Sequence, residues 1–359
     1  MATEQHQATE QFLPLPAFLT ALQPWVGWHL VGFWREVSVG QTPHETIWRR
    51  NKARLYYYAA QATPRHNVPI LMIYSLMNRP YILDLRPGAS LVEFLVGQGY
   101  EVYLLDWGVP GPEDANITLA DYVLEYLPRA VKHTLSHAHA PALTLFGYCL
   151  GATLALCYAA LDVAAPLKNL VTIAAPVDFE EKGLLQHWLA VPDFDLDLIV
   201  DSYGIIPGEI LDLGVRLLKP YQNFVTTYTD IWQQRNNQAA VAAWLSMQKW
   251  VNDSVPFVGA AFRQCVQDLY RDNKLSKGDL CLDTCRVDLS NLTCPLLNVI
   301  AARDHIVLPS QSRALTSIIN SQDKQEILVS GGHVGMVVGR KASHELWPAL
   351  AEWLAHRSD

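Results

Sequence analysis

Cys149 stands in the stretch "GYCLGAT", where its neighbours give it the setting of a nucleophile. Gly147 and Gly151 complete the spacing glycine–x–nucleophile–x–glycine, in which the reactive side chain sits on a tight, strained turn from a strand into a helix. The dipole of that helix favours a thiolate, and the N–H of Leu150 is free to face a developing oxyanion. The pattern predicts a cysteine that attacks a carbonyl carbon; the alternative is a small buried cysteine that only fills space after a strand.

A cysteine nucleophile needs a base, and two loops late in the chain carry suitable residues. Asp304 follows the apolar run "PLLNVIAA" in "RDHIV", and His333 follows "EILVS" in "GGHVG". In α/β-hydrolases the nucleophile, the acid and the histidine occur in this order along the chain. We therefore predict that Cys149, Asp304 and His333 form a catalytic triad at the carboxyl edge of a parallel sheet. His305 would share the loop of Asp304, so we assign it a structural or substrate-side role.

The second oxyanion donor is expected in the loop after the run "PILMIYS". The backbone N–H groups of Leu76 and Met77 are the two candidates. Asn78 and Arg79, in the following "NRPYILDL", are as readily turn and surface residues as functional ones.

The elements that must position these residues alternate along most of the chain. Apolar runs rich in β-branched and aromatic residues, with helical patterns between them, predict an α/β fold of the α/β-hydrolase type with a mostly parallel sheet. The runs cover residues 69–75, 101–107, 142–147, 169–175, 295–302 and 326–330. Between residues 178 and 290 the alternation gives way to helical patterns rich in Trp, Asn, Gln and Asp, which predict a helical cap over the carboxyl edge of the sheet.

The predicted core therefore comprises residues 51–177 and 291–359, with the cap at 178–290 inserted between its two parts. An apolar, aromatic N-terminal segment, residues 1–50, precedes it, and its stretch 12–37 holds three tryptophans. This stretch predicts either a helix packed on the core or a helix that docks on a partner or an apolar surface.

The composition excludes several functions. Charged residues make up 17% of the chain and the formal net charge is -8, so no basic face is available for nucleic acid. The polar start "MATEQHQATEQ" lacks the pattern of a secretory leader, and no run of about 18 apolar residues predicts a membrane span. We expect a cytoplasmic protein whose six cysteines are free thiols. We expect no metal site, since neither a histidine nor a second close cysteine pair completes "CLDTC" and Cys294.

Five motifs in order, "NRPYILDL", "YEVYLLDWG", "GYCLGAT", "DHIV" and "GGHVG", resemble those of polyhydroxyalkanoate synthases. The resemblance spans roughly residues 50–356 and is close to the short catalytic subunits of the two-component class III or class IV enzymes. It implies polymerisation of (R)-3-hydroxyacyl-CoA, such as (R)-3-hydroxybutyryl-CoA, into polyhydroxybutyrate or a related polymer with release of coenzyme A. It further implies a second synthase subunit, a homodimer or hetero-oligomer, a place at the surface of a cytoplasmic storage granule, and no cofactor.

The family's nucleophile, aspartate and histidine fall on Cys149, Asp304 and His333. In this family the aspartate is thought to help activate the hydroxyl of the incoming monomer, besides orienting the histidine. One departure is visible: the family's box usually ends in two glycines, and Ala152 follows Gly151 here. Alanine is small and favours helices, so we expect little damage.

A cysteine suits this chemistry because an enzyme thioester stays energised for transfer to an alcohol, whereas a serine ester would lose much of that driving force. A cysteine thioesterase or ester hydrolase with the same three residues is the rival interpretation, and it predicts free hydroxy acid in place of polymer. A granule-bound structural protein with an inactive hydrolase core is the non-enzyme alternative. It predicts loss of at least one triad member, and all three residues are present.

Overall fold

The computed structural model describes residues 37–63, 65–161, 165–191 and 194–358. The chain divides into two units, Met1–Val37 and Ser38–Asp359, and the second unit contains the sheet and all the predicted site residues. Residues 12–36 of the predicted apolar stretch lie outside the described residues.

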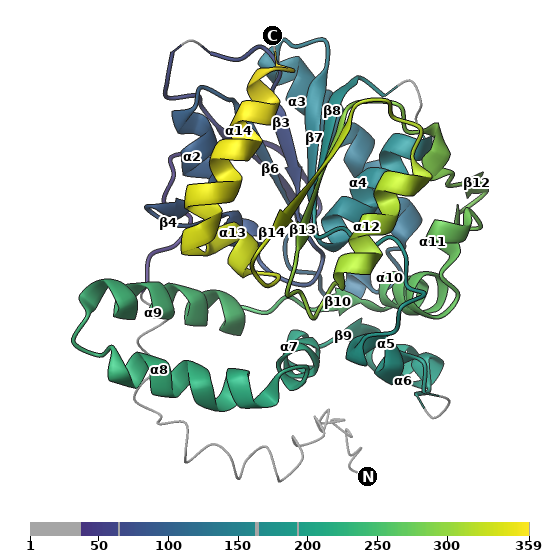
Figure 1. Ribbon diagram of the computed structural model, residues 1–359. Coiled ribbons are helices and arrows are strands. Elements are labelled where there is room, and N and C mark those ends of the chain that lie inside the picture. Colours follow the sequence, from purple (N-terminus) through teal and green to yellow (C-terminus); the bar gives the residue numbers. More distant parts are fainter. Residues whose placement is uncertain (1–36, 64, 162–164, 192–193, 359) are drawn as a thin grey trace, which may run out of the picture. The chain divides into compact units, whose positions relative to one another are not determined.

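An eight-stranded sheet forms the centre of this unit, with the order β1-β2-β6-β3-β7-β8-β13-β14 (Figure 1). The β1–β2 and β2–β6 pairs are antiparallel and every other pair is parallel, which confirms the predicted fold class. The strands are β1 (Glu45–Arg50), β2 (Ala53–Tyr58), β3 (Ile70–Ile73), β6 (Val102–Asp106), β7 (Leu143–Tyr148), β8 (Leu167–Ile173), β13 (Leu296–Ala301) and β14 (Lys324–Val329).

Alternate side chains of the central strands enter two separate hydrophobic cores, one on each face of the sheet. In β3, Leu71 and Ile73 belong to one core, and Ile70 and Met72 belong to the other. Because both faces are covered, these strands are apolar at most positions, which is the pattern that the sequence showed.

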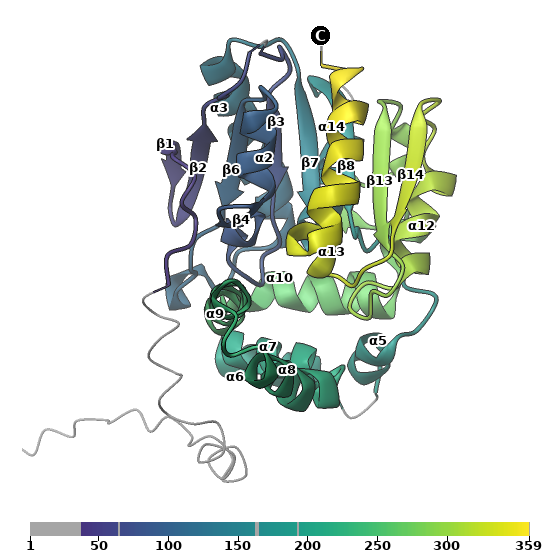
Figure 2. The same ribbon diagram turned by 60° about the vertical axis from the view of Figure 1, so that its left-hand side comes forward.

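Helices cover both faces of the sheet (Figure 2). One face carries α2 (Leu91–Gly97), α13 (Gly335–Val338) and α14 (Trp347–Ala355). The other carries the π-helical turn η4 (Asp121–Tyr126), α3 (Leu127–Ala138), α4 (Leu150–Leu161) and α12 (Pro309–Ile318). Small elements complete the core: η2 (Pro80–Leu83), η3 (Pro112–Asp114), η7 (Leu289–Asn291), η8 (Ala342–Leu346), β4 (Asp84–Arg86) and β5 (Ala89–Ser90).

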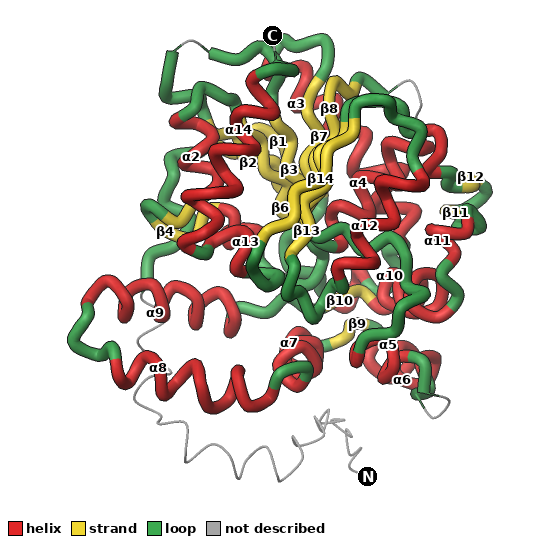
Figure 3. Tube along the Cα trace, viewed as in Figure 1, coloured by secondary structure: helices red, strands yellow, loops and turns green. Residues whose placement is uncertain are grey.

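Between β8 and β13 the chain is largely helical, and most of these helices lie on the side of the sheet where the parallel strands end (Figure 3). The short strands β9 and β10 pair with each other and join two parts of this region. The limits of the cap at residues 178 and 290 stay a prediction. The elements are α5 (Leu184–Leu189), α6 (Leu196–Tyr203), β9 (Ile205–Ile206), α7 (Gly208–Leu217), η5 (Gln222–Thr226), α8 (Thr227–Gln233), α9 (Gln238–Asn252), β10 (Phe257–Val258), α10 (Gly259–Gln264), η6 (Cys265–Arg271), α11 (Lys274–Lys277), β11 (Cys281–Leu282) and β12 (Cys285–Arg286).

None of the helices described is both long enough and apolar enough to cross a membrane. All six cysteines are free thiols, as predicted.

Candidate active site

Cys149 lies at the turn between β7 and α4, with a backbone φ of 54°. A positive φ is strained for a residue with a β-carbon, and such strain is typical of a nucleophile on a sharp strand-to-helix turn. Two backbone bonds hold the turn: the Cys149 N–H donates to the Ile173 carbonyl at 2.9 Å, and the Ala152 N–H donates to the Cys149 carbonyl at 2.9 Å. The side chain is half-buried at the start of a helix.

The two turn glycines are required by close packing. A β-carbon on Gly147 would lie 2.3 Å from the α-carbon of Ala152, and one on Gly151 would lie 2.4 Å from the Ile73 carbonyl oxygen. The atoms that would clash belong to the backbone, which cannot move aside as the end of a flexible side chain could. The start of α4 therefore rests directly on the backbone that leaves β3.

Ala152 fits this packing. It is fully buried in α4, and its backbone is not among the positive-φ residues, so the helix does not require glycine here. Its own β-carbon lies 2.8 Å from the point where a Gly147 β-carbon would be. The methyl group thus occupies the space that Gly147 leaves open.

His333 and Asp304 are in direct contact. The loop after β13 carries Asp304, the loop after β14 carries His333, and His333 Nδ1 lies 2.6 Å from Asp304 Oδ2. The other carboxylate oxygen, Oδ1, accepts the N–H groups of Ile306 at 2.9 Å and Val307 at 3.0 Å. Both side chains are buried, that of Asp304 to 1% exposure. The carboxylate is therefore fixed at both oxygens.

The electrostatics of the pair favour a charged imidazole. Burial alone would lower the pKa of His333, but the charges of Asp304 and of a Cys149 thiolate, together with hydrogen bonds to both side chains, raise that pKa well above its ordinary value. Burial likewise opposes ionisation of Asp304, yet the His333 imidazolium and the two backbone N–H groups hold its pKa below the usual range. Cys149 lies near enough to this pair for the charge of its thiolate to contribute to the pKa of His333, so the structure brings the three predicted residues together.

Tyr148 is a part of this arrangement that sequence reasoning missed. Its hydroxyl donates to the His333 carbonyl oxygen at 3.1 Å, so the residue before the nucleophile anchors the loop that carries the base. Its position inside "GYCLGAT" was visible, but no sequence pattern indicates a partner 185 residues away.

His305 does not take the place of His333. Burial and the nearby charge of Lys219 lower the pKa of His305, whereas His333 holds the hydrogen bond to Asp304. Its predicted structural or substrate-side role stays a prediction.

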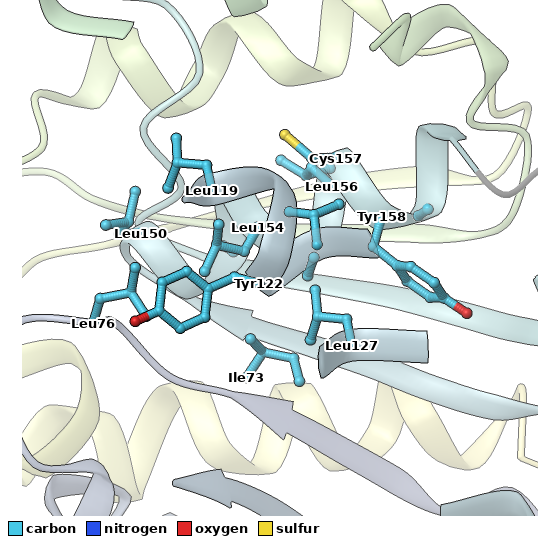
Figure 4. Close-up of a cluster of buried hydrophobic side chains, with 14 of the residues drawn as sticks. Ile73, Leu76, Leu119, Tyr122, Leu127, Leu150, Leu154, Leu156, Cys157 and Tyr158 are labelled. Carbon is cyan, nitrogen blue, oxygen red and sulfur yellow. The ribbon is translucent and has the colours of Figure 1, made fainter. Parts of the chain in front are cut away.

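The candidate oxyanion donors lie at the start of α4 and in the loop after β3. Leu76 and Leu150 both bury their side chains in the same core, close to Leu119 and Tyr122 (Figure 4). The Met77 N–H donates to Ser75 Oγ at 3.4 Å. Within the described part of the chain, the N–H groups of Leu76 and Leu150 have no hydrogen-bond acceptor. This difference favours Leu76 over Met77 as the second donor.

Comparisons with known proteins indicate the family to which this chain belongs. Residues 68–339 match the model of the alpha/beta hydrolase fold, and residues 33–95 match the N-terminal model of poly-beta-hydroxybutyrate polymerase (PhaC). The chain is 39% identical over 328 residues to the poly(3-hydroxyalkanoate) polymerase subunit PhaC of Synechocystis sp., covering 90% of this chain and 86% of the relative.

The chain belongs to the poly(3-hydroxyalkanoate) polymerase family. It is also 37% identical over 325 residues to the PhaC subunit of Haloferax mediterranei; there it aligns over 90% of its own length and 66% of the relative. The chain therefore spans just under two thirds of this longer family member. A soluble variant of monoglyceride lipase from Saccharomyces cerevisiae has the same fold, with a TM-score of 0.55, 15% identity, and coverage of 90% of this chain and 99% of the lipase.

Family membership and hydrolase fold were both predicted from the sequence, and both are confirmed. The roles of Cys149, Asp304 and His333 stay predictions, which the His333–Asp304 hydrogen bond and the nearby Cys149 support.

Proposed function

We propose that this chain is the catalytic subunit that polymerises (R)-3-hydroxyacyl-CoA, with release of coenzyme A and an acyl chain carried on Cys149. The observation that carries the proposal is a cysteine on a strained turn beside a hydrogen-bonded His333–Asp304 pair, in a chain of the poly(3-hydroxyalkanoate) polymerase family. The chemistry needs no metal and no cofactor.

Acylation begins when His333 takes the proton of the Cys149 thiol, which forms a thiolate and an imidazolium. The sulfur of Cys149 attacks the thioester carbonyl, the bond to coenzyme A breaks, and the departing thiolate takes its proton from His333. The negative charge on the tetrahedral oxygen is stabilised by the N–H of Leu150 and, in our assignment, by that of Leu76. One thioester is exchanged for another, so little free energy is lost.

In chain transfer the proton moves in the opposite direction, from the substrate to His333. Neutral His333 takes the proton from a 3-hydroxyl group, whose oxygen attacks the Cys149 thioester, and the thiolate and imidazolium form again. Asp304 exposes almost no surface, and both of its oxygens already accept hydrogen bonds. We therefore place its effect on the hydroxyl through His333 and without direct contact.

The cap offers the surface for partners. Eleven large hydrophobic side chains are exposed among the described residues, and nine of them, from Leu184 to Trp232, lie in the helices between α5 and α8. Such apolar surface suits a second synthase subunit or a polymer granule in the cytoplasm, and either contact would account for a homodimer or hetero-oligomer on the granule.

The test combines release of coenzyme A with product analysis. We expect the chain, purified with a second synthase subunit from a PhaC relative, to release coenzyme A from (R)-3-hydroxybutyryl-CoA and to form polymer. Cys149→Ala should abolish both, and Cys281→Ala, at an exposed thiol, should change neither. Free 3-hydroxybutyrate in place of polymer would establish the thioesterase interpretation, and full activity of Cys149→Ala would refute the nucleophile.

A further inference from the structure

The loop that follows β3, residues 74–79, is tied to the cap as well as to the core. On the core side, Trp107 Nε1 donates to the Tyr74 carbonyl oxygen at 2.8 Å. The remainder of the loop contacts the C-terminal end of α9 and the residues just after it, and α9 packs beside the short strand β4.

The cap stretch 250–255 forms three hydrogen bonds with this loop. Two of them involve backbone carbonyl groups of the loop, and the third involves the guanidinium group of Arg79. Trp250 Nε1 donates to the Arg79 carbonyl oxygen at 2.8 Å, and the Val255 N–H donates to the Met77 carbonyl oxygen at 3.4 Å. Arg79 Nε donates to Asp253 Oδ1 at 3.3 Å. The indole of Trp250 is buried, so its bond is shielded from water.

Asp253 accepts two hydrogen bonds at this junction between the cap stretch 250–255 and the loop 74–79. Its second oxygen, Oδ2, accepts the hydroxyl of Tyr81 at 3.1 Å, so one carboxylate joins both sides of the turn at Pro80. Burial and the Asp253 charge both raise the pKa of Tyr81, which keeps that hydroxyl protonated as a donor. The side chains of Arg79 and Asp253 are about one third exposed, and such an ion pair adds little stability by itself, typically below about 1 kcal/mol.

The position of this junction also bears on the second oxyanion donor. Leu76, the favoured second oxyanion donor, lies between the bond to the core at Tyr74 and the bonds to the cap at Met77 and Arg79. An oxyanion donor acts only when its N–H points at the atom where charge develops, so small displacements of this loop change the rate.

We infer that Asp253 is a positioning residue: from the end of α9 it fixes Arg79 and Tyr81, and so sets the second oxyanion donor against Cys149. The cap thereby takes part in forming the catalytic site as well as covering it. This inference rests on the proposed function, since it concerns the oxyanion of that reaction.

The test compares two reactions of the same thiol. Attack on a thioester needs the oxyanion donors, whereas alkylation of Cys149 by iodoacetamide forms no oxyanion. In the chain assayed with its second subunit, we expect Asp253→Asn to lower kcat for release of coenzyme A about tenfold, with KM within about twofold and an unchanged rate of alkylation at Cys149.

Asp268→Asn is the matched control, because Asp268 in η6 forms a partly buried ion pair with Lys274 in α11, and neither residue belongs to the loop 74–79 or to the stretch 250–255. It should leave all three quantities at the wild-type values. A wild-type kcat for Asp253→Asn overturns the inference, and so does an equal fall in alkylation and release, which would indicate general damage to the nucleophile turn.

Tyr81→Phe carries the test if Asp253→Asn fails to fold, since it removes one of the same two bonds and keeps the ring. We expect about a threefold lower kcat with unchanged alkylation, and a wild-type kcat would overturn the inference. If the unmodified chain with its second subunit releases no coenzyme A from hydroxyacyl thioesters, the proposed function itself fails, which is a different result from a variant that behaves like the wild type.

Discussion

Replacement of Asp304 by asparagine is the sharpest probe of the proposed mechanism, because the structure dictates how the amide must sit. Oδ1 of Asp304 accepts two backbone N–H groups, from Ile306 and Val307. The amide nitrogen of an asparagine cannot take that place, since it would face two donors. It must therefore take the place of Oδ2, 2.6 Å from His333 Nδ1.

The consequence is a change of tautomer. With an N–H donor opposite Nδ1, His333 must accept there and carry its proton on Nε2, where it cannot receive a proton from Cys149 or from a substrate hydroxyl. The wrong tautomer at a comparable histidine lowers turnover by about 10⁴, or about 5 kcal/mol of transition-state stabilisation. We expect a similar loss in kcat/KM for Asp304→Asn.

The assay is release of coenzyme A, followed with a thiol reagent over a range of substrate concentrations. Asp304→Ala is the informative comparison, because it removes the charge without imposing a tautomer. We expect Asp304→Asn to be no more active than Asp304→Ala. If the asparagine variant kept at least ten times the kcat/KM of the alanine variant, the argument from the fixed amide would be refuted.

Three further outcomes are expected from the structure. Gly151→Ala should lower the free energy of unfolding in urea by about 2–4 kcal/mol, because its methyl group would meet backbone at 2.4 Å; a loss below about 0.5 kcal/mol would contradict the packing. The His333–Asp304 pair should stabilise the fold most between about pH 4 and pH 6.5: the raised pKa of His333 gives stability that declines as pH rises through the folded value, and the lowered pKa of Asp304 gives stability that declines as pH falls through its own. His333→Gln should remove this dependence from urea midpoints measured across about pH 4–9, and an identical profile in the variant would speak against the charged pair. Tyr221→Ser with Trp232→Ser should reduce the fraction of protein that sediments with isolated granules, leaving release of coenzyme A from soluble substrate within about twofold; unchanged sedimentation would exclude this part of the cap as the granule contact.

The sequence predicted the elements that are apolar on both faces. The run at 142–147 became β7, and the run at 295–302 became β13, because a strand covered on both sides is apolar at most positions. The β1–β2 hairpin was not predicted. Its strands are antiparallel, and β1 is partly exposed and carries Glu45 and two arginines, so no continuous apolar run marks it.

The order of residues along the chain sufficed to nominate the candidate site, since the carboxyl ends of parallel strands meet at one edge. Its supporting contacts could not be derived in this way. The bond from Tyr148 to His333 spans 185 residues, and that from Arg79 to Asp253 spans 174. Both depend on side-chain conformations that only the packed fold determines.

The same separation has a consequence for biosynthesis. The nucleophile turn leaves the ribosome long before the loop with His333, whose carbonyl is the partner of Tyr148 across 185 residues. At about 5–20 residues per second, that interval lasts on the order of 10–40 s. Every helix of the cap is translated within it, because α5 to α11 all precede His333. The nascent thiol therefore meets its base only after every helix of the cap has been synthesised.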